Sequence, residues 1–146
     1  MVRVRPIDVE DLDLLEPIDA AAAARADAEP ALTRGSVSFY GRTGHAFVAE
    51  GASGVRGFAL AQAVWDGRRP TVRLQTLAVA DDGDCEARAA LLEAVTKSAY
   101  DAAVYDLVAE VPGADDEAQR LLAAEGWRRE PVRTFRRTLG SRGVDA

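Results

Sequence analysis

The stretch LAVADDGDCEARAALL, from Leu77 to Leu92, decides the fold of this chain. Its first three residues end the stretch Thr71–Val79, in which Val72, Leu74 and Thr76 alternate with Arg73, Gln75 and Leu77 as in a strand. The Asp and Gly residues that follow favour a turn. Ala87, Leu91 and Val95 then recur at the spacing of one helix face. The stretch therefore predicts a strand that passes through an acidic loop directly into a helix.

The whole chain has the size and composition of one globular domain. It contains 146 residues, of which 48% are hydrophobic and 29% are charged. A chain of this length buries about two-thirds of its unfolded surface, so it needs no disulfide or metal. We expect a single domain over residues 1–139 and a flexible tail over residues 140–146. Cys85 is the one cysteine, which excludes an intramolecular disulfide and makes a metal cluster unexpected.

The net charge and the lengths of the apolar runs indicate where the protein is located and which classes of partner it does not bind. The net charge of −6 argues against general nucleic-acid binding, because phosphates repel an acidic protein. Charges interrupt the N-terminal residues every two or three positions, which is not the pattern of a signal peptide. No apolar run approaches the ~18 residues of a membrane span. We therefore expect a cytoplasmic protein without nucleic-acid or membrane partners.

Arginines gather near the C-terminus. One interpretation is a patch for an anionic ligand or partner. The other is the solvated face of an outer strand followed by a frayed tail, which is the simpler view because no aromatic stacking platform accompanies the arginines. The cluster, opposed by Glu130 alone, comprises Arg128, Arg129, Arg133, Arg136, Arg137 and Arg142.

The periodicity of apolar residues predicts an alternation of strands and helices. Helices are expected after Asp8, as one short turn at 36–40, at 87–99, and after Asp115. The order is a meander followed by a crossover, which predicts an α/β fold with a mixed sheet of about six to seven strands and about four flanking helices. The predicted strands are residues 2–5, 45–50, 55–65, 71–79, 104–111, 127–129 and 132–139.

Four segments together resemble the GNAT superfamily of N-acetyltransferases. They occur in the order and spacing of that superfamily, over roughly Val2 to Leu139. The resemblance implies the GNAT fold, and acyl transfer from acetyl-CoA or another acyl-CoA to a small-molecule or peptide amine. The segments are Phe47–Glu50 and Gly54–Ala59 for the second and third strands, Leu77–Val79 for the end of the fourth, and Val111–Trp127 for the closing segment.

The same resemblance implies a cofactor site at the acidic loop. In the superfamily, acetyl-CoA lies between the splayed fourth and fifth strands, and its pyrophosphate sits at the N-terminus of the following helix. Free amides and the helix dipole attract an anion there. The implied contacts are Leu77, Ala78 and Val79 in the strand, and Gly83, Asp84, Cys85, Glu86, Ala87 and Arg88 in the loop.

The loop departs from the signature of the superfamily. The Arg/Gln position and the two glycine positions are Gly83, Glu86 and Arg88 here. Carboxylates suit the dipole at a helix start and cap its amides. We therefore expect the chain to fill its own anion site, with the four carboxylates of Asp81, Asp82, Asp84 and Glu86.

Glu110 and Glu50 are the candidates for a general base that takes a proton from an amine. Glu110 lies near the end of the predicted strand 104–111, close to where the substrates of the superfamily lie. A carboxylate that merely closes a strand is the alternative. His45 is a weaker candidate base, and Cys85 at a helix start is a candidate reactive thiol. The tyrosine general acid of the superfamily corresponds to Leu122, which cannot donate a proton.

Three functions remain open from the sequence. The first is an acyl-CoA-dependent N-acyltransferase with an atypical loop. The second is a catalytically inactive ligand-binding or regulatory module that no longer binds acetyl-CoA. The third is a structural role in a homodimer, through an outer strand or the arginine-rich C-terminal strands.

Overall fold

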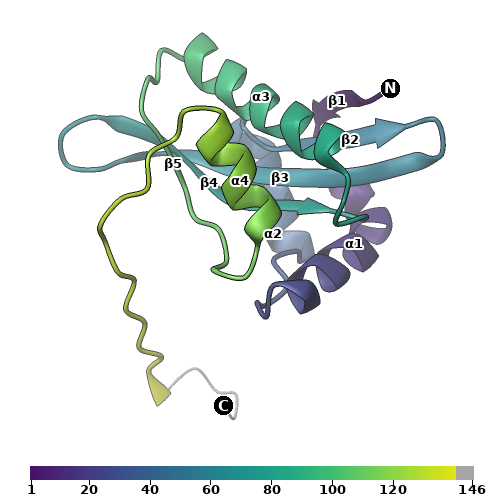
Figure 1. Cartoon of the computed structure of the whole chain (residues 1–146), viewed down its shortest axis with the longest axis horizontal. Helices are drawn as coiled ribbons and strands as arrows, with labels where there is room; N and C mark the ends of the chain where they lie inside the picture. The colour runs from purple at the N-terminus through teal and green to yellow at the C-terminus, as the bar shows by residue number, and fades with distance from the viewer. Residues whose placement is uncertain (141–146) are drawn as a thin grey trace.

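Five strands form one mixed sheet in the computed structural model, which describes residues 1–140. The first four strands make an antiparallel meander, and the fifth pairs with β4 in parallel (Figure 1). The predicted mixed sheet is confirmed, with five strands in place of six to seven. The strands, in spatial order, are β1 (Arg3–Pro6), β2 (Phe47–Gly51), β3 (Gly54–Trp65), β4 (Pro70–Val79) and β5 (Leu107–Ala109).

Local capping explains where the helices begin. Asp8 caps the 3-10 turn η1 (Val9–Asp11), which leads into α1 (Leu12–Arg25). Thr33 and Ser36 form a capping box, so α2 (Arg34–Thr43) is a full helix rather than the single turn predicted. The remaining helices are α3 (Cys85–Asp101), capped by Asp84, and α4 (Asp116–Ala124), capped by Asp115. Within residues 1–140, no helix is long and apolar enough to cross a membrane.

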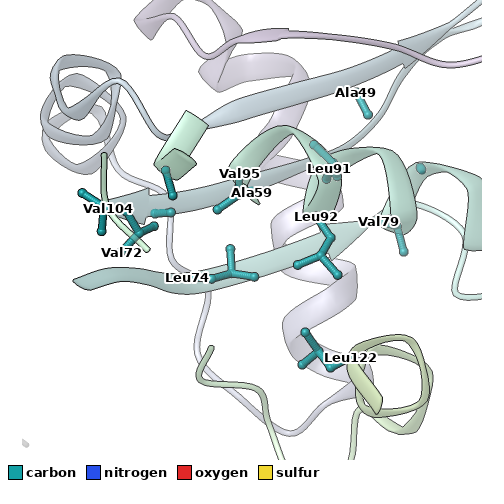
Figure 2. Packing of buried hydrophobic residues seen from close by; sticks show 13 residues of the cluster. Ala49, Ala59, Val72, Leu74, Val79, Leu91, Leu92, Val95, Val104 and Leu122 are labelled. Atoms are coloured by element: carbon teal, nitrogen blue, oxygen red, sulfur yellow. The ribbon is translucent and has the colours of Figure 1, made fainter. Parts of the chain in front are cut away.

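The helices cover both faces of the sheet. On one face, α3 and α4 pack on a cluster that includes Leu74, Val79, Leu91 and Leu122 (Figure 2). On the other face, residues of α1 and α2 pack against Val48, Phe58 and Leu60 of the sheet. The long apolar stretch Phe58–Val64 indicates a strand covered on both faces, and the middle of β3 is indeed buried on both sides.

The two predicted closing strands, 127–129 and 132–139, are wrong for this structure. Trp127 packs against the core, but residues 128–140, which we name the C-terminal arm, run away from the body of the protein (Figure 1). A strand forms only where a neighbouring strand takes up its backbone groups, and the arm leaves α4 without meeting one. The predicted tail, 140–146, lies outside the described residues except for Gly140.

Candidate functional site

The parallel pair β4–β5 opens toward the C-terminal end of β4. The two strands pair only between Val72–Leu74 and Leu107–Ala109. Leu60 faces Thr76 and Ala61 faces Leu74, so Gln75 is an extra residue in β4. A bulge of this kind bends a strand and ends its pairing. Residues 75–79 therefore continue without a β5 partner.

A small cavity occupies this opening. Its volume is about 170 Å³, and it lies between the end of β4 and the start of α4, beside the end of α1. Such a volume holds part of a slender ligand rather than a whole drug-sized one. The lining includes Leu77, Ala78 and Val79 from β4, Arg25 from α1, Arg88 from α3, and Asp115 and Arg120 from α4.

Backbone groups of β4 face the opening. The Val79 carbonyl oxygen accepts a hydrogen bond from Arg25 Nη2 at 2.8 Å, on the side of β4 away from β3. Alternate residues of a strand direct their N–H and C=O groups to the same side, so Leu77 also presents its backbone to the opening. The N–H groups of Leu77 and Val79 and the Leu77 carbonyl are thus placed to pair with an extended amide-bearing ligand.

Most backbone amides of the loop before α3 donate hydrogen bonds to acceptors within the same loop. The Asp81 side chain accepts from the Gly83 N–H at 3.0 Å, and the Asp84 side chain accepts from the Ala87 N–H at 3.0 Å. The amides of Asp84, Cys85 and Arg88 donate to carbonyl oxygens of the same loop. A phosphate at this helix start would have to displace these bonds, so the loop does not fit a pyrophosphate as it stands.

Arginines from three different elements pair with three of the four carboxylates of the loop, those of Asp82, Asp84 and Glu86. Arg56 of β3 binds Asp84 through two bonds of 2.8 and 2.6 Å, and also reaches Glu86 at 3.1 Å. The hydrogen bond from Arg56 lowers the pKa of Asp84, so that this carboxylate stays charged as a helix cap. Asp81 and Asp84 thus occupy two of the loop amides, and the expectation that the chain fills its own anion site stays a prediction.

Arg88 stands at one of the two positions where the superfamily carries glycine. Its side chain is only 3% exposed, and its Nη2 lies 2.9 Å from Asp82 Oδ1. Arg25 approaches the same carboxylate oxygen at 3.5 Å. The side chain of Arg88 thus takes space that a glycine would leave open, and holds the loop closed.

Glu110 lies directly after β5, at the side of the opening. Its carboxylate pairs with Arg73 of β4 at 2.9 Å and remains 45% exposed. Burial and, to a smaller extent, the charge of Glu110 raise the pKa of Tyr40 in α2. A carboxylate and a guanidinium thus pair at the end of the β4–β5 ladder. No local pattern around Arg73 indicates that it pairs with Glu110.

Glu50 lies elsewhere. It lies near the end of β2, two strands away from β4, and its carboxylate pairs with Arg3 and Arg5 of β1. These arginines lower its pKa, with the hydrogen bond from Arg3 as the largest cause. The structure therefore does not bring Glu50 and Glu110 together. A catalytic role for either residue stays a prediction.

The three other residues considered from the sequence, His45, Cys85 and Leu122, lie outside the opening between β4 and β5. His45 is buried, and its Nδ1 lies 2.7 Å from Ser98 Oγ at the far end of α3. Burial lowers its pKa. Cys85 is exposed at the first residue of α3. Leu122, at the position of the tyrosine of the superfamily, belongs to the core (Figure 2).

Comparisons with known proteins show the family of this chain and structures that share its fold. A family model described as "Protein of unknown function (DUF1999)" matches residues 3–143. The crystal structure of wild-type TTHA1254 from Thermus thermophilus is 38% identical, covers 96% of this chain and 99% of its own, and has a TM-score of 0.76. No curated protein matches.

Two more distant structures share the fold at low identity. A ribosomal-protein-alanine N-acetyltransferase from Brucella melitensis biovar Abortus 2308 is 15% identical, with a TM-score of 0.72 over 96% of this chain and 100% of that one. A predicted acetyltransferase with acetyl-CoA from Clostridium acetobutylicum is 12% identical, with a TM-score of 0.70 over 94% and 96% of the two chains. The fold is thus that of GNAT acetyltransferases.

Proposed function

Because the chain belongs to the DUF1999 family of proteins of unknown function and has the fold of GNAT acetyltransferases, we propose that it transfers an acyl group from an acyl thioester to an amine. The observation that carries this proposal is the open edge of β4 over residues 75–79. When bound there, the donor supplies an activated acyl group. The backbone of Leu77 and Val79 holds its amide-bearing arm, which needs no particular side chain.

Glu110 is the residue proposed to accept the proton of the amine. It is partly exposed beside the opening, and Arg73 fixes its position. Glu110→Gln removes the base and keeps the side-chain shape, so transfer to an amine should fall about 10²–10⁴-fold while donor affinity stays the same. Glu93→Gln, an exposed position on α3, is the matched control and should change neither quantity.

The closed loop before α3 predicts how the donor is recognised. With the amides of Gly83, Asp84, Cys85, Ala87 and Arg88 already paired, the loop adds little to the binding of the nucleotide part of CoA. Calorimetric titration should therefore give similar affinities for acetyl-CoA and S-acetylpantetheine. A much tighter binding of acetyl-CoA would mean that the loop opens for phosphate. Absence of heat with both ligands at millimolar concentration would overturn the acyltransferase proposal.

A ligand-binding module without catalysis is the second candidate. The specific observation in its favour is the self-paired loop, together with Leu122 in the core in place of a proton donor. This candidate predicts that neither thioester binds. It also predicts that neither the wild type nor Glu110→Gln catalyses acyl transfer. The titration above separates the two candidates. Cytoplasmic location and the absence of nucleic-acid and membrane partners remain predictions.

A further inference from the structure

The C-terminal arm, residues 128–140, is an extended segment whose described residues find no partner in the body of the chain. Its large apolar side chains are exposed: 71% for Val132, 92% for Phe135 and 63% for Leu139. Among the described residues, its hydrogen bonds and ion pairs stay within the arm. Residues 132–139 are nevertheless rich in β-branched and aromatic residues, which favour a strand.

The edge of the sheet at β5 is open to such a strand. The Asp106 carbonyl and the Glu110 N–H bond to β4, so by alternation Leu107 and Ala109 direct their backbone groups away from the sheet. No strand of the described chain lies beyond β5. An open edge of this kind is a template for a strand from another chain.

The surroundings of β5 are complementary to the arm in chemistry. Tyr100 and Tyr105 form an edge-to-face pair at the start of β5, and each is 69% exposed. Asp106 and Glu110 flank the strand with carboxylates that pair with Arg69 and Arg73 of the same chain, yet remain 48% and 45% exposed. The arm offers Phe135 to the aromatic pair and arginines to the carboxylates.

The overall charge points to a second copy of this chain as the occupant. Residues 128–140 hold five arginines and one glutamate, whereas residues 1–127 hold 22 acidic and 12 basic residues. When two copies of such a chain meet, the basic arm of each copy attracts the acidic body of the other. In a two-fold dimer, each copy would both give an arm and receive one.

We propose that two copies of this chain exchange their C-terminal arms, each arm adding a strand to the open edge of β5 in the partner. The exchange satisfies the backbone of both the arm and the edge. It also places the arm beside Glu110, at the side of the opening. The inference does not depend on acyl transfer, because it rests on the arm and the edge alone.

Light scattering and sedimentation of the full chain test the proposal. The wild-type chain should be a dimer at high concentration. Phe135→Glu should raise the dimer dissociation constant by at least about tenfold, as loss of a central aromatic contact does. Ala109→Pro removes a donor from the open edge without touching the bonds to β4, and should act likewise. Leu14→Glu, another exposed apolar residue, is the control and should leave the dimer intact.

Cross-linking identifies which arm meets which edge. A tagged copy with Val108→Cys and an untagged copy with Phe135→Cys, both with Cys85→Ser, should give a mixed dimer with a short bis-maleimide. A chain that stays monomeric at all concentrations would overturn the proposal. So would a dimer that is insensitive to Phe135→Glu. Cross-linking confined to one chain that carries both cysteines would place the arm on its own β5, and would also overturn it.

Discussion

Gly57 lies in β3 where the backbone of β4 approaches closely. A Cβ at this position would meet the Ala78 carbonyl oxygen at 2.5 Å and Val79 Cγ1 at 3.0 Å. The carbonyl belongs to a central strand and cannot move aside cheaply. Gly57→Ala should therefore lower the free energy of unfolding by about 1–3 kcal/mol, as measured by urea denaturation.

Gly113 provides the matched control for that substitution. A Cβ there meets no atom within 4 Å, so Gly113→Ala should stay within about 0.5 kcal/mol of the wild type. Because Ala78 and Val79 line the opening, Gly57→Ala should also weaken thioester binding. Equal losses of stability in both variants would contradict the packing argument.

His45 links stability to pH. Burial lowers its pKa below the ordinary value of about 6.5, so the folded protein resists protonation while the unfolded chain accepts it. The stabilising effect is complete above the unfolded pKa, and is lost as the pH falls below it toward the folded pKa. Between pH 7.5 and 5, the wild type should lose more unfolding free energy than His45→Gln, as followed by denaturant titration. Parallel curves for the two proteins would refute this role.

At the scale of elements, the start of α3 determines how the site treats phosphate. Asp84 caps the helix through the Ala87 N–H and binds Arg56, which also holds Glu86. Asp84→Gly with Glu86→Gly frees one amide and one guanidinium at the helix start. Affinity for acetyl-CoA should rise by about tenfold or more, because each 1.4 kcal/mol gained is about a factor of ten.

Two controls accompany this double variant. S-acetylpantetheine, which lacks the pyrophosphate, should bind it no better than the wild type. Thermal unfolding should show a loss of only about a few tenths of a kcal/mol from the changed cap, because glycine is itself tolerated at an N-cap, so the helix stays formed. An unchanged affinity for acetyl-CoA would mean that phosphate does not approach this loop.

Local sequence patterns predicted most of the helices and strands, because each pattern depends only on residues within the same helix or strand. The alternation in β1 to β4, the apolar face of α3 and the capping residues Asp8 and Asp115 all depend on neighbours in sequence. The closing strands failed for the opposite reason. Residues 132–139 have strand composition, yet pairing depends on where the chain runs after Gly126, which no local pattern states.

In the candidate site, too, features that depend on local sequence were predictable and contacts between distant residues were not. The open end of Leu77–Val79 and the position of Glu110 followed from the predicted strands and the resemblance. Arg25 meets Val79 across 54 positions of sequence, and Arg56 meets Asp84 across 28. Nothing in the local sequence of either arginine indicates such a partner. The acidic residues of the loop could therefore be predicted to cap the helix, whereas the arginines that bind them could not be predicted.

The distribution of charge over the whole molecule governs the proposed assembly. An arm with an excess of arginine meets a body with ten more acidic than basic residues, 22 against 12. This attraction acts between partly exposed groups, and salt shortens its range from about 10 Å at 0.1 M to about 3 Å at 1 M. Sedimentation at these two concentrations should therefore show a weaker dimer at high salt. The triple variant Arg133→Gln, Arg136→Gln and Arg137→Gln should be weaker at low salt and should lose most of the salt dependence. A dimer that tightens with salt in both proteins would contradict a role for the arginines, because screening weakens charge attraction, whereas exclusion of salt from the protein surface strengthens apolar burial.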